Sequence, residues 1–231
     1  MIGGYRLSRG NQVVSVSGAA QRLVAYLALH EGSPRLVVAA GLWPESSDEH
    51  ALSNLRTTTS RLRKTTPGLL APRSQTLRLD PTVRVDLEDV LAAAETAAEA
   101  AHPAALARRL ARVGDLLPGW YDDWVLFERE QLQQQLISAS ETLAERLLSA
   151  GEVAAAVAAA TAAIHREPLR ESSHRLLVRV HLAAGNRVEA WHAYERFRRR
   201  SIAEVGLAPD SSFQALVAEL ARERQRRRRS S

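Results

Sequence analysis

The sequence predicts a mainly α-helical protein, in which an N-terminal winged helix-turn-helix with small β elements precedes an all-α, tetratricopeptide-like helical repeat domain. Two observations carry this prediction. Before residue 86, three helical segments stand between short β-branched stretches, which is the element order of a winged helix. Farther on, Gly151 and Gly185 stand 34 residues apart, the period of the tetratricopeptide repeat. The 231 residues are 45% apolar and lack cysteine, so we expect ordinary hydrophobic cores without disulfides.

The first predicted elements are a β-hairpin and two short helices. The hairpin covers residues 5–17, with its turn at Arg9–Gly10–Asn11 and β-branched valines after it. A helix over residues 19–30 follows, because apolar side chains recur there on one side, and Gly32 ends it. The second helix is expected over residues 34–42, with a proline at its tolerated first position.

The third helix carries the candidate binding surface. Ser46, Ser47 and Asp48 are good N-cap residues for it. A buried stripe follows at three- and four-residue steps, formed by Leu52, Leu55, Thr59 and Leu62. The opposite surface is rich in Asn, Thr, Ser and Arg, which can bond both base edges and phosphates in a DNA major groove. We predict base contacts by Asn54, Thr57, Thr58 and Arg61, and phosphate contacts by Arg56, Ser60, Arg63 and Lys64. A solvated amphipathic helix is the alternative interpretation of this pattern.

Two β-like stretches after this helix predict the wing. They are residues 76–79 and 83–85, separated by the turn-forming Asp80–Pro81. Arg73 precedes them and is expected to hold a DNA phosphate from the wing.

From residue 86 the chain is Ala-rich and helical. Small residues and leucines recur at the 34-residue offset, where small side chains let paired helices approach closely. The matched pairs are Leu143 with Leu177, Leu148 with Leu182, Ala150 with Ala184, Ala156 with Ala190, and Ala159 with Ala193. Pro168 falls where such a repeat ends its second helix.

Charge divides the chain into three blocks. Residues 1–85 carry 11 basic and 5 acidic side chains, residues 86–221 carry 14 and 20, and residues 222–231 carry 6 and 1. A basic first block suits a polyanion, whereas an acidic body does not. The predicted domains are therefore a winged-helix DNA-binding domain over 1–85, a helical repeat domain over 86–221, and a disordered basic tail over 222–231.

The sequence predicts no catalytic residue, no metal site and no cofactor. Lys64–Thr65 lacks the Gly-rich loop of a phosphate-binding motif, and neither a G-x-S-x-G nor an H-E-x-x-H motif occurs. His174 and His181 share a helix face but are interpreted as packing residues, and Asp122–Asp123 as a helix N-cap beside aromatic residues. No signal peptide or membrane span is expected, so the predicted location is the cytoplasm, on the nucleoid.

Several stretches together resemble the Streptomyces antibiotic regulatory protein (SARP) family, with an OmpR-type winged helix and a bacterial transcriptional activator domain. The resemblance covers almost the whole chain. It rests on SGAAQRLVAYLALHEG, LWPESSDEHALSNLRTTTSRLRK, LRLDPTVRVDLEDV, LLPGWYDDWVLFEREQL and EPLRESSHRLLVRVHLAAGNRVEAWHAYERFRRR.

Membership of that family implies an actinobacterial, sequence-specific activator that binds direct repeats of double-stranded promoter DNA as a side-by-side homodimer. It also implies recruitment of RNA polymerase to secondary-metabolite genes. The alternative is a tetratricopeptide-like protein-interaction adaptor without sequence-specific DNA binding, whose basic N-terminal third would be incidental.

Overall fold

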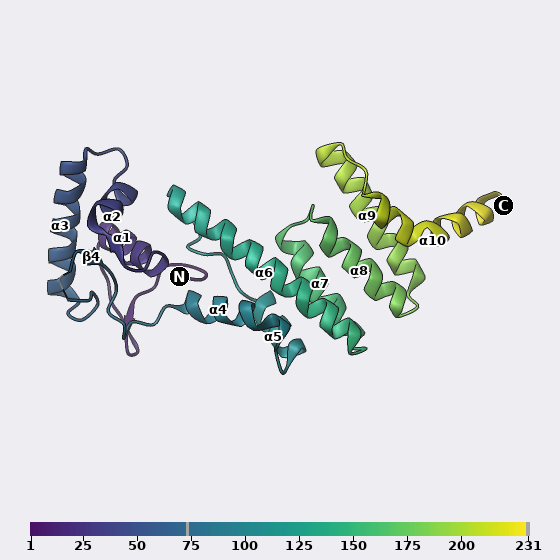
Figure 1. Ribbon diagram of the computed structural model, residues 1–231, viewed down its shortest axis with the longest axis horizontal. Helices are drawn as coiled ribbons and strands as arrows, with labels where there is room; N and C mark the ends of the chain where they lie inside the picture. The colour runs from purple at the N-terminus through teal and green to yellow at the C-terminus, as the bar shows by residue number, and fades with distance from the viewer. Residues whose placement is uncertain (73, 230–231) are drawn as a thin grey trace. The chain divides into compact units, whose positions relative to one another are not determined.

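The computed structural model describes residues 1–72 and 74–229, and for residues 223–229 it describes the backbone alone. Helices dominate (Figure 1). The strands of the described chain form two-stranded antiparallel pairs, β1 with β2 and β3 with β4. In chain order the elements are β1 (Ser8–Arg9), β2 (Gln12–Val13), α1 (Gly18–Leu29), β3 (Ser33–Pro34), α2 (Arg35–Leu42), α3 (Asp48–Thr65), β4 (Thr76–Leu77), α4 (Asp86–Glu95), a short 3-10 helix (Thr96–Ala98), α5 (Pro103–Ala111), α6 (Asp123–Ser149), α7 (Val153–Arg166), α8 (Glu171–Ala183), α9 (Arg187–Val205) and α10 (Ser211–Arg229). The predicted fold class is confirmed.

The chain forms two compact units that interleave along the sequence. The N-terminal unit comprises Met1–Val90 and Gly114–Leu132, and the C-terminal unit comprises Leu91–Val113 and the chain from Gln133 onward. A single boundary at residue 86 was predicted, so the segment 114–132 is the main difference between the expected domains and the compact units.

Backbone pairing ties this segment to the beginning of the chain. The N–H of Leu117 donates to the carbonyl of Met1 at 3.0 Å, and the N–H of Gly3 donates to the carbonyl of Asp115 at 2.8 Å. Neither pair is signalled by local periodicity, because more than a hundred residues separate the partners.

Aromatic rings attach the start of α6 to the same unit. The ring centroid of Trp124 lies 5.2 Å from that of Tyr26 on α1, in an edge-to-face arrangement, and 6.4 Å from that of Trp120. Trp120 in turn stacks on Tyr5 at 6.0 Å. Trp124 also packs against the buried core formed by α1, α2 and α3.

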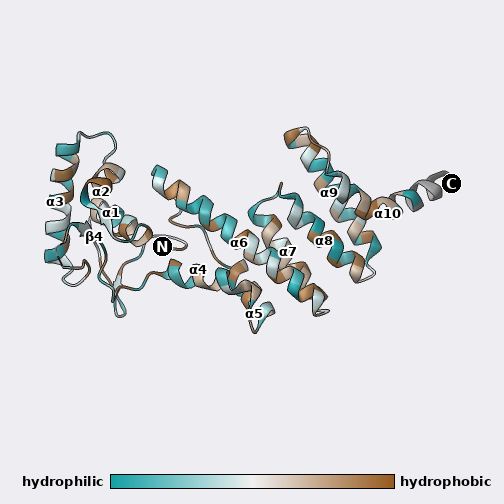
Figure 2. Ribbon diagram, viewed as in Figure 1, coloured by the Kyte–Doolittle hydropathy of each residue, from teal (hydrophilic) through white to brown (hydrophobic). Residues whose placement is uncertain are grey.

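That core positions the helix-turn-helix. Each of its three helices turns one apolar side inward, as the sequence predicts for α1 and α3. Side chains that are at most 2% exposed include Leu23 and Leu27 of α1, Val38 and Leu42 of α2, and Leu55 and Leu62 of α3. Figure 2 shows hydrophobic and hydrophilic stretches alternating along α3, as expected of a helix with one buried side.

The predicted N-terminal hairpin forms, but it is short. Ser8 pairs with Val13 and Arg9 with Gln12. The turn between them places Gly10 at φ +57, a left-handed conformation that glycine adopts at little cost.

The β elements around α3 differ from the prediction. Pro34 does not open α2 but belongs to β3, whose Ser33 and Pro34 pair with Leu77 and Thr76 of β4. Residues 83–85 form no strand. The described part of the wing instead runs over residues 69–80, where the N–H of Asp80 donates to the carbonyl of Leu69 at 3.0 Å.

Asp80 explains why the chain turns rather than continuing as a strand. Its Oδ1 accepts the hydroxyl of Thr82 at 2.6 Å and the backbone N–H of Thr82 at 3.0 Å. These two hydrogen bonds hold the pKa of Asp80 below its usual value. An Asx-type turn of this kind competes with strand pairing at residues 80–83.

The 34-residue repeat appears in the C-terminal unit as two helices that end with the same backbone motif. Gly151 at φ +75 and Gly185 at φ +74 follow α6 and α8. The N–H of Glu152 donates to the carbonyl of Leu147 at 2.9 Å, and the N–H of Asn186 donates to that of His181 at 2.8 Å. Both are Schellman endings, in which a left-handed residue lets the chain reverse into the next helix.

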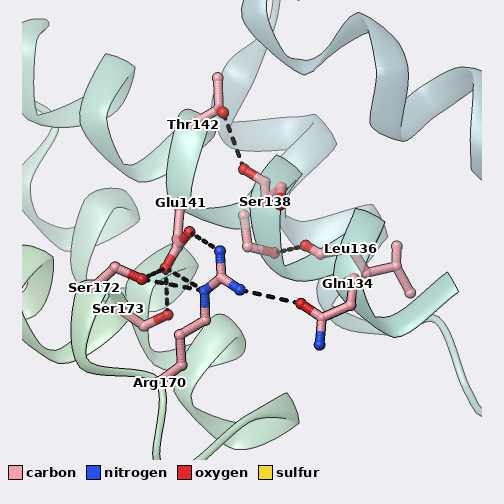
Figure 3. A network of polar contacts seen from close by, with 9 residues as sticks. Gln134, Leu136, Ser138, Glu141, Thr142, Arg170, Ser172 and Ser173 are labelled. Carbon is pink, nitrogen blue, oxygen red and sulfur yellow. Dashed lines mark hydrogen bonds and ion pairs between the residues drawn. The ribbon is translucent and has the colours of Figure 1, made fainter. Parts of the chain in front are cut away.

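A polar network joins α6 to the start of α8 within the C-terminal unit (Figure 3). Both carboxylate oxygens of Glu141 accept Arg170, through Nε and Nη2 at 3.1 Å each. Glu141 Oε1 also accepts the hydroxyls of Ser172 at 2.6 Å and Ser173 at 2.7 Å. Gln134 accepts Arg170 Nη1 at 3.1 Å. The serines open α8, so the network fixes where α8 begins relative to α6.

The predicted disorder of the tail is not what the structure describes for residues 222–229. The backbone of α10 stays helical to Arg229, because Arg, Glu and Gln are good helix formers and the helix is already nucleated at Ser211. The last two residues of the predicted tail, 230 and 231, lie outside the described residues.

Candidate nucleic-acid interface

The beginning of α3 is defined by Ser47. Its hydroxyl accepts the backbone N–H of His50 at 3.4 Å, so Ser47 is the N-cap of the predicted set. Asp48 and Glu49 lie in the first turn and Arg63 and Lys64 in the last, an arrangement that the helix dipole favours at both ends.

The buried side of α3 is wider than the predicted stripe. Ala51, Leu55 and Leu62 are almost fully buried. Thr59 is buried too, and its hydroxyl donates to the carbonyl of Leu55 within the helix. A threonine side chain has one hydrogen-bond donor, so this bond leaves no donor of Thr59 unpaired in the core.

Thr58 lies on this buried side, so its predicted contact with a base edge is wrong. Only 8% of Thr58 is exposed. It follows Leu55 by three residues and precedes Leu62 by four, and such spacings place residues on one side of a helix. The neighbouring Thr57 is exposed, as predicted.

The outer surface of α3 brings together six of the predicted residues. All six are exposed, and they lie on the side that faces away from Leu55 and Leu62. They are Asn54, Arg56, Thr57, Ser60, Arg61 and Lys64. We call these six residues the α3 surface. Asn54, Thr57, Arg61 and Lys64 recur at steps of three and four, so they form a continuous ridge along the helix.

Arg63 is turned inward, so its predicted phosphate contact is not supported. Its side chain is half-buried, and Nη2 donates to the carbonyl of Ala71 at 2.7 Å. This bond holds the end of α3 against the beginning of the wing. Arg73, also predicted to contact phosphate, lies outside the described residues.

The other polar residues singled out from the sequence, His174 and Asp122, make contacts that stabilise the fold. His174 is buried, its ring lies 4.6 Å from that of Phe197, and its Nε2 lies 3.0 Å from the carbonyl oxygen of Pro168. Burial lowers the pKa of His174 below its usual value. The backbone carbonyl of Asp122 accepts the N–H groups of Val125 and Leu126, which agrees with the N-cap interpretation, and its carboxylate pairs with Arg22.

Within residues 1–72 and 74–229, no group of three His, Asp or Glu side chains is placed to hold a metal ion. Across the same described residues, none of the helices combines the length and the apolar character that crossing a bilayer requires.

Comparison with known proteins identifies a family to which the chain is similar. Residues 83–221 match the model of the bacterial transcriptional activator domain. The regulatory protein AfsR of Streptomyces coelicolor is 30% identical over 230 residues, and AfsR of Streptomyces griseus is 30% identical over 227 residues. These alignments cover 94% and 90% of the chain but only 23% of either relative, so the chain spans about a quarter of their length.

A solved structure supports the same fold. Mycobacterium tuberculosis EmbR, determined in complex with a low-affinity phosphopeptide, superposes with a TM-score of 0.76 at 20% identity. The superposition covers 95% of this chain and 63% of EmbR. It therefore extends over both compact units.

Proposed function

Because the chain belongs to the bacterial transcriptional activator domain family, we propose that it is a sequence-specific transcriptional activator that binds promoter DNA through α3. Its similarity to AfsR agrees with the SARP resemblance seen in the sequence. One observation carries the proposal: the α3 surface presents groups that can bond bases or phosphates, opposite a buried side that is mostly apolar. Cytoplasmic, nucleoid-associated action follows from such a function.

The α3 surface divides by chemistry into two sets. Asn54, Thr57 and Arg61 lie along the ridge and are assigned to base edges, where Asn suits adenine and Arg suits guanine. Arg56, Ser60 and Lys64 are assigned to phosphates, which fix orientation without adding sequence information. Neither Thr58 nor Arg63 takes part.

We expect Arg61→Ala and Lys64→Ala to weaken DNA binding in different ways. Arg61→Ala should cost about 1–3 kcal/mol and relax the preference at one base position, if its guanidinium bonds guanine in two places. Lys64→Ala should weaken binding to all sequences alike and flatten the dependence of log K on log salt by about one unit. The measurement is equilibrium binding of the full chain to duplexes selected from a random-sequence library.

Arg108→Ala is the matched control for both variants, because Arg108 is an exposed arginine of α5, outside the N-terminal unit. It should leave affinity and sequence preference unchanged. If Arg61→Ala retained the full affinity and the same selected sequence, the assignment of Arg61 to a base would be wrong.

The helical repeat domain of residues 86–221 is assigned to protein partners. These residues carry 14 basic and 20 acidic side chains, a net charge of −6 that disfavours DNA. We propose that this region contacts RNA polymerase and the second protomer of a homodimer on DNA. Such a dimer would occupy two direct repeats of a promoter, and its target genes would be those of secondary metabolism.

Spacing between two binding sites tests the dimer. Protomers that touch while facing the same side of DNA need sites separated by whole helical turns, about 10–10.5 base pairs each. A five-base insertion between direct repeats should lower occupancy of the second site about tenfold, a usual size for cooperative coupling. A ten-base insertion is the control and should restore much of that occupancy. Footprinting of the full chain measures both, and equal occupancy on all templates would favour a monomeric binder.

The adaptor alternative makes the opposite prediction for the whole chain. The paired helices α7, α8 and α9, together with the Schellman endings after α6 and α8, are the feature that favours it. An adaptor would bind selected and random duplexes equally weakly, and Arg61→Ala would change neither. Library selection that yields no shared sequence would therefore support the adaptor over the activator.

A further inference from the structure

A second basic surface lies in the N-terminal unit, at the end of α3. An open groove of about 610 Å³ is formed there by three segments: the β1–β2 hairpin, the loop at residues 66–69, and residues 82–84. Its lining includes the arginines Arg6, Arg9 and Arg84. None of the three was selected from the sequence, because they lie outside helices and share no periodic face.

The charge of this groove is of one sign. No acidic side chain is found among the described residues that line it. Arg6 and Arg84 are exposed, and no described residue gives either of them a hydrogen bond or an ion pair. Unpaired guanidinium groups of this kind are suited to phosphate oxygens, which they can bond in a fork geometry.

Arg9 has a structural role in the groove. Its Nη2 donates to the carbonyl of Pro67 and so joins the hairpin to the loop after α3. The turns at Gly10 and Gly68, with φ values of +57 and +86, border the same groove. An ion approaching Arg6 and Arg84 therefore meets a surface that the Arg9–Pro67 hydrogen bond and the two glycine turns hold in place.

The groove lies close to the C-terminal end of the α3 surface. Thr66, the C-cap of α3, lines it and follows Lys64 by two residues. When a helix lies in the major groove, the sugar–phosphate backbones border it on both sides, so the chain leaving the helix passes over phosphates. The groove therefore lies where such phosphates are expected to contact the protein.

We propose that Arg6 and Arg84 bind backbone phosphates of the DNA, beyond the base pairs that α3 contacts. This inference rests on the proposed function and extends the DNA-binding surface to the N-terminal hairpin and to residues 82–84. These contacts position the protein and strengthen binding to any sequence, without adding base preference.

The test compares the full chain with the double variant Arg6→Ala/Arg84→Ala on selected and random duplexes. Loss of two phosphate contacts should flatten the salt dependence of log K by about two units and lower affinity about tenfold at 0.1 M salt. Base preference should not change. Phosphate ethylation interference should disappear outside the base pairs protected by α3.

Two further variants make the result specific. Arg6→Lys/Arg84→Lys keeps both charges and should restore most of the salt dependence, which also shows that the chain is folded. Arg108→Ala/Arg112→Ala removes two exposed arginines of and after α5 and should leave the salt dependence unchanged.

Three outcomes would overturn the proposal, and they are distinguishable. If Arg61→Ala weakens binding while Arg6→Ala/Arg84→Ala changes neither salt dependence nor ethylation interference, the groove assignment fails and the proposed function stands. If the wild-type chain binds no duplex, both fail. If the double variant loses binding of inorganic tripolyphosphate but keeps wild-type DNA binding, the groove takes a free phosphorylated molecule instead.

Discussion

Trp124→Ala is expected to destabilise the N-terminal unit by about 2–4 kcal/mol, toward the lower end for aromatic truncations because the ring is only partly buried. Its ring lies 5.2 Å from Tyr26 and packs against the core that supports α3. Although Trp124 stands outside the predicted DNA-binding domain of residues 1–85, its loss should loosen α1, α2 and α3. Hydrogen exchange of peptides from these helices, in the full chain, measures the effect.

Two other substitutions test whether the loss of stability comes from the packing of the Trp124 ring. Trp124→Phe keeps an aromatic ring, and the buried indole Nε1 has no hydrogen-bond partner among the described residues, so this variant should lose about 1 kcal/mol or less. Phe127→Ala removes a ring that is 61% exposed on the same helix and should change stability within about 0.5 kcal/mol. Wild-type exchange in Trp124→Ala would mean that α6 is not needed by the helix-turn-helix.

Glu141→Gln should destabilise the C-terminal unit by about 2–3 kcal/mol at neutral pH. The carboxylate is 18% exposed and accepts four hydrogen bonds, two of them from Arg170, which is 31% exposed. A neutral amide replaces one acceptor with a donor and leaves the guanidinium without its counter-charge. Partial exposure of both groups keeps the loss below that of a fully buried pair. Urea unfolding and hydrogen exchange of α8 peptides measure it.

The effect of Glu141 should depend on pH. Burial raises the pKa of Glu141, but hydrogen bonds from Arg170, Ser172 and Ser173 outweigh it, so the pKa lies below its usual value. A lowered pKa means that the stabilisation is complete above the unfolded-state pKa of about 4.3 and is lost as pH falls through the folded-state pKa. The difference between wild type and Glu141→Gln should therefore shrink below about pH 4.

Glu145→Gln is the matched control for Glu141→Gln. Glu145 lies one turn farther along α6 and pairs with Arg179 at 3.0 Å, but both side chains are at least half exposed. Exposed ion pairs contribute little, so about 0.5 kcal/mol or less should be lost. Equal losses in the two variants would show that the network of Figure 3 is no more stabilising than a surface ion pair.

The α3 surface could be predicted from the sequence because it depends on local geometry. Helix periodicity separates Leu55 and Leu62 from Asn54, Thr57 and Arg61 without knowledge of any neighbour. The same periodicity places Thr58 among the buried residues, so its assignment to a base was an error of interpretation. Arg63 is different, because its orientation depends on the carbonyl of Ala71 in the wing.

By itself the sequence determined the order of the helices, the outer surface of α3, and the 34-residue repeat with its glycine-ended helices. These features follow from interactions between residues a few positions apart, which spacing records directly. Only the tertiary structure decided that segment 114–132 completes the N-terminal unit, that β3 pairs with β4, and that three arginines meet at the end of α3. Such contacts join residues far apart in the chain. Packing and loop closure determine which of these residues meet, and local periodicity carries no information about either.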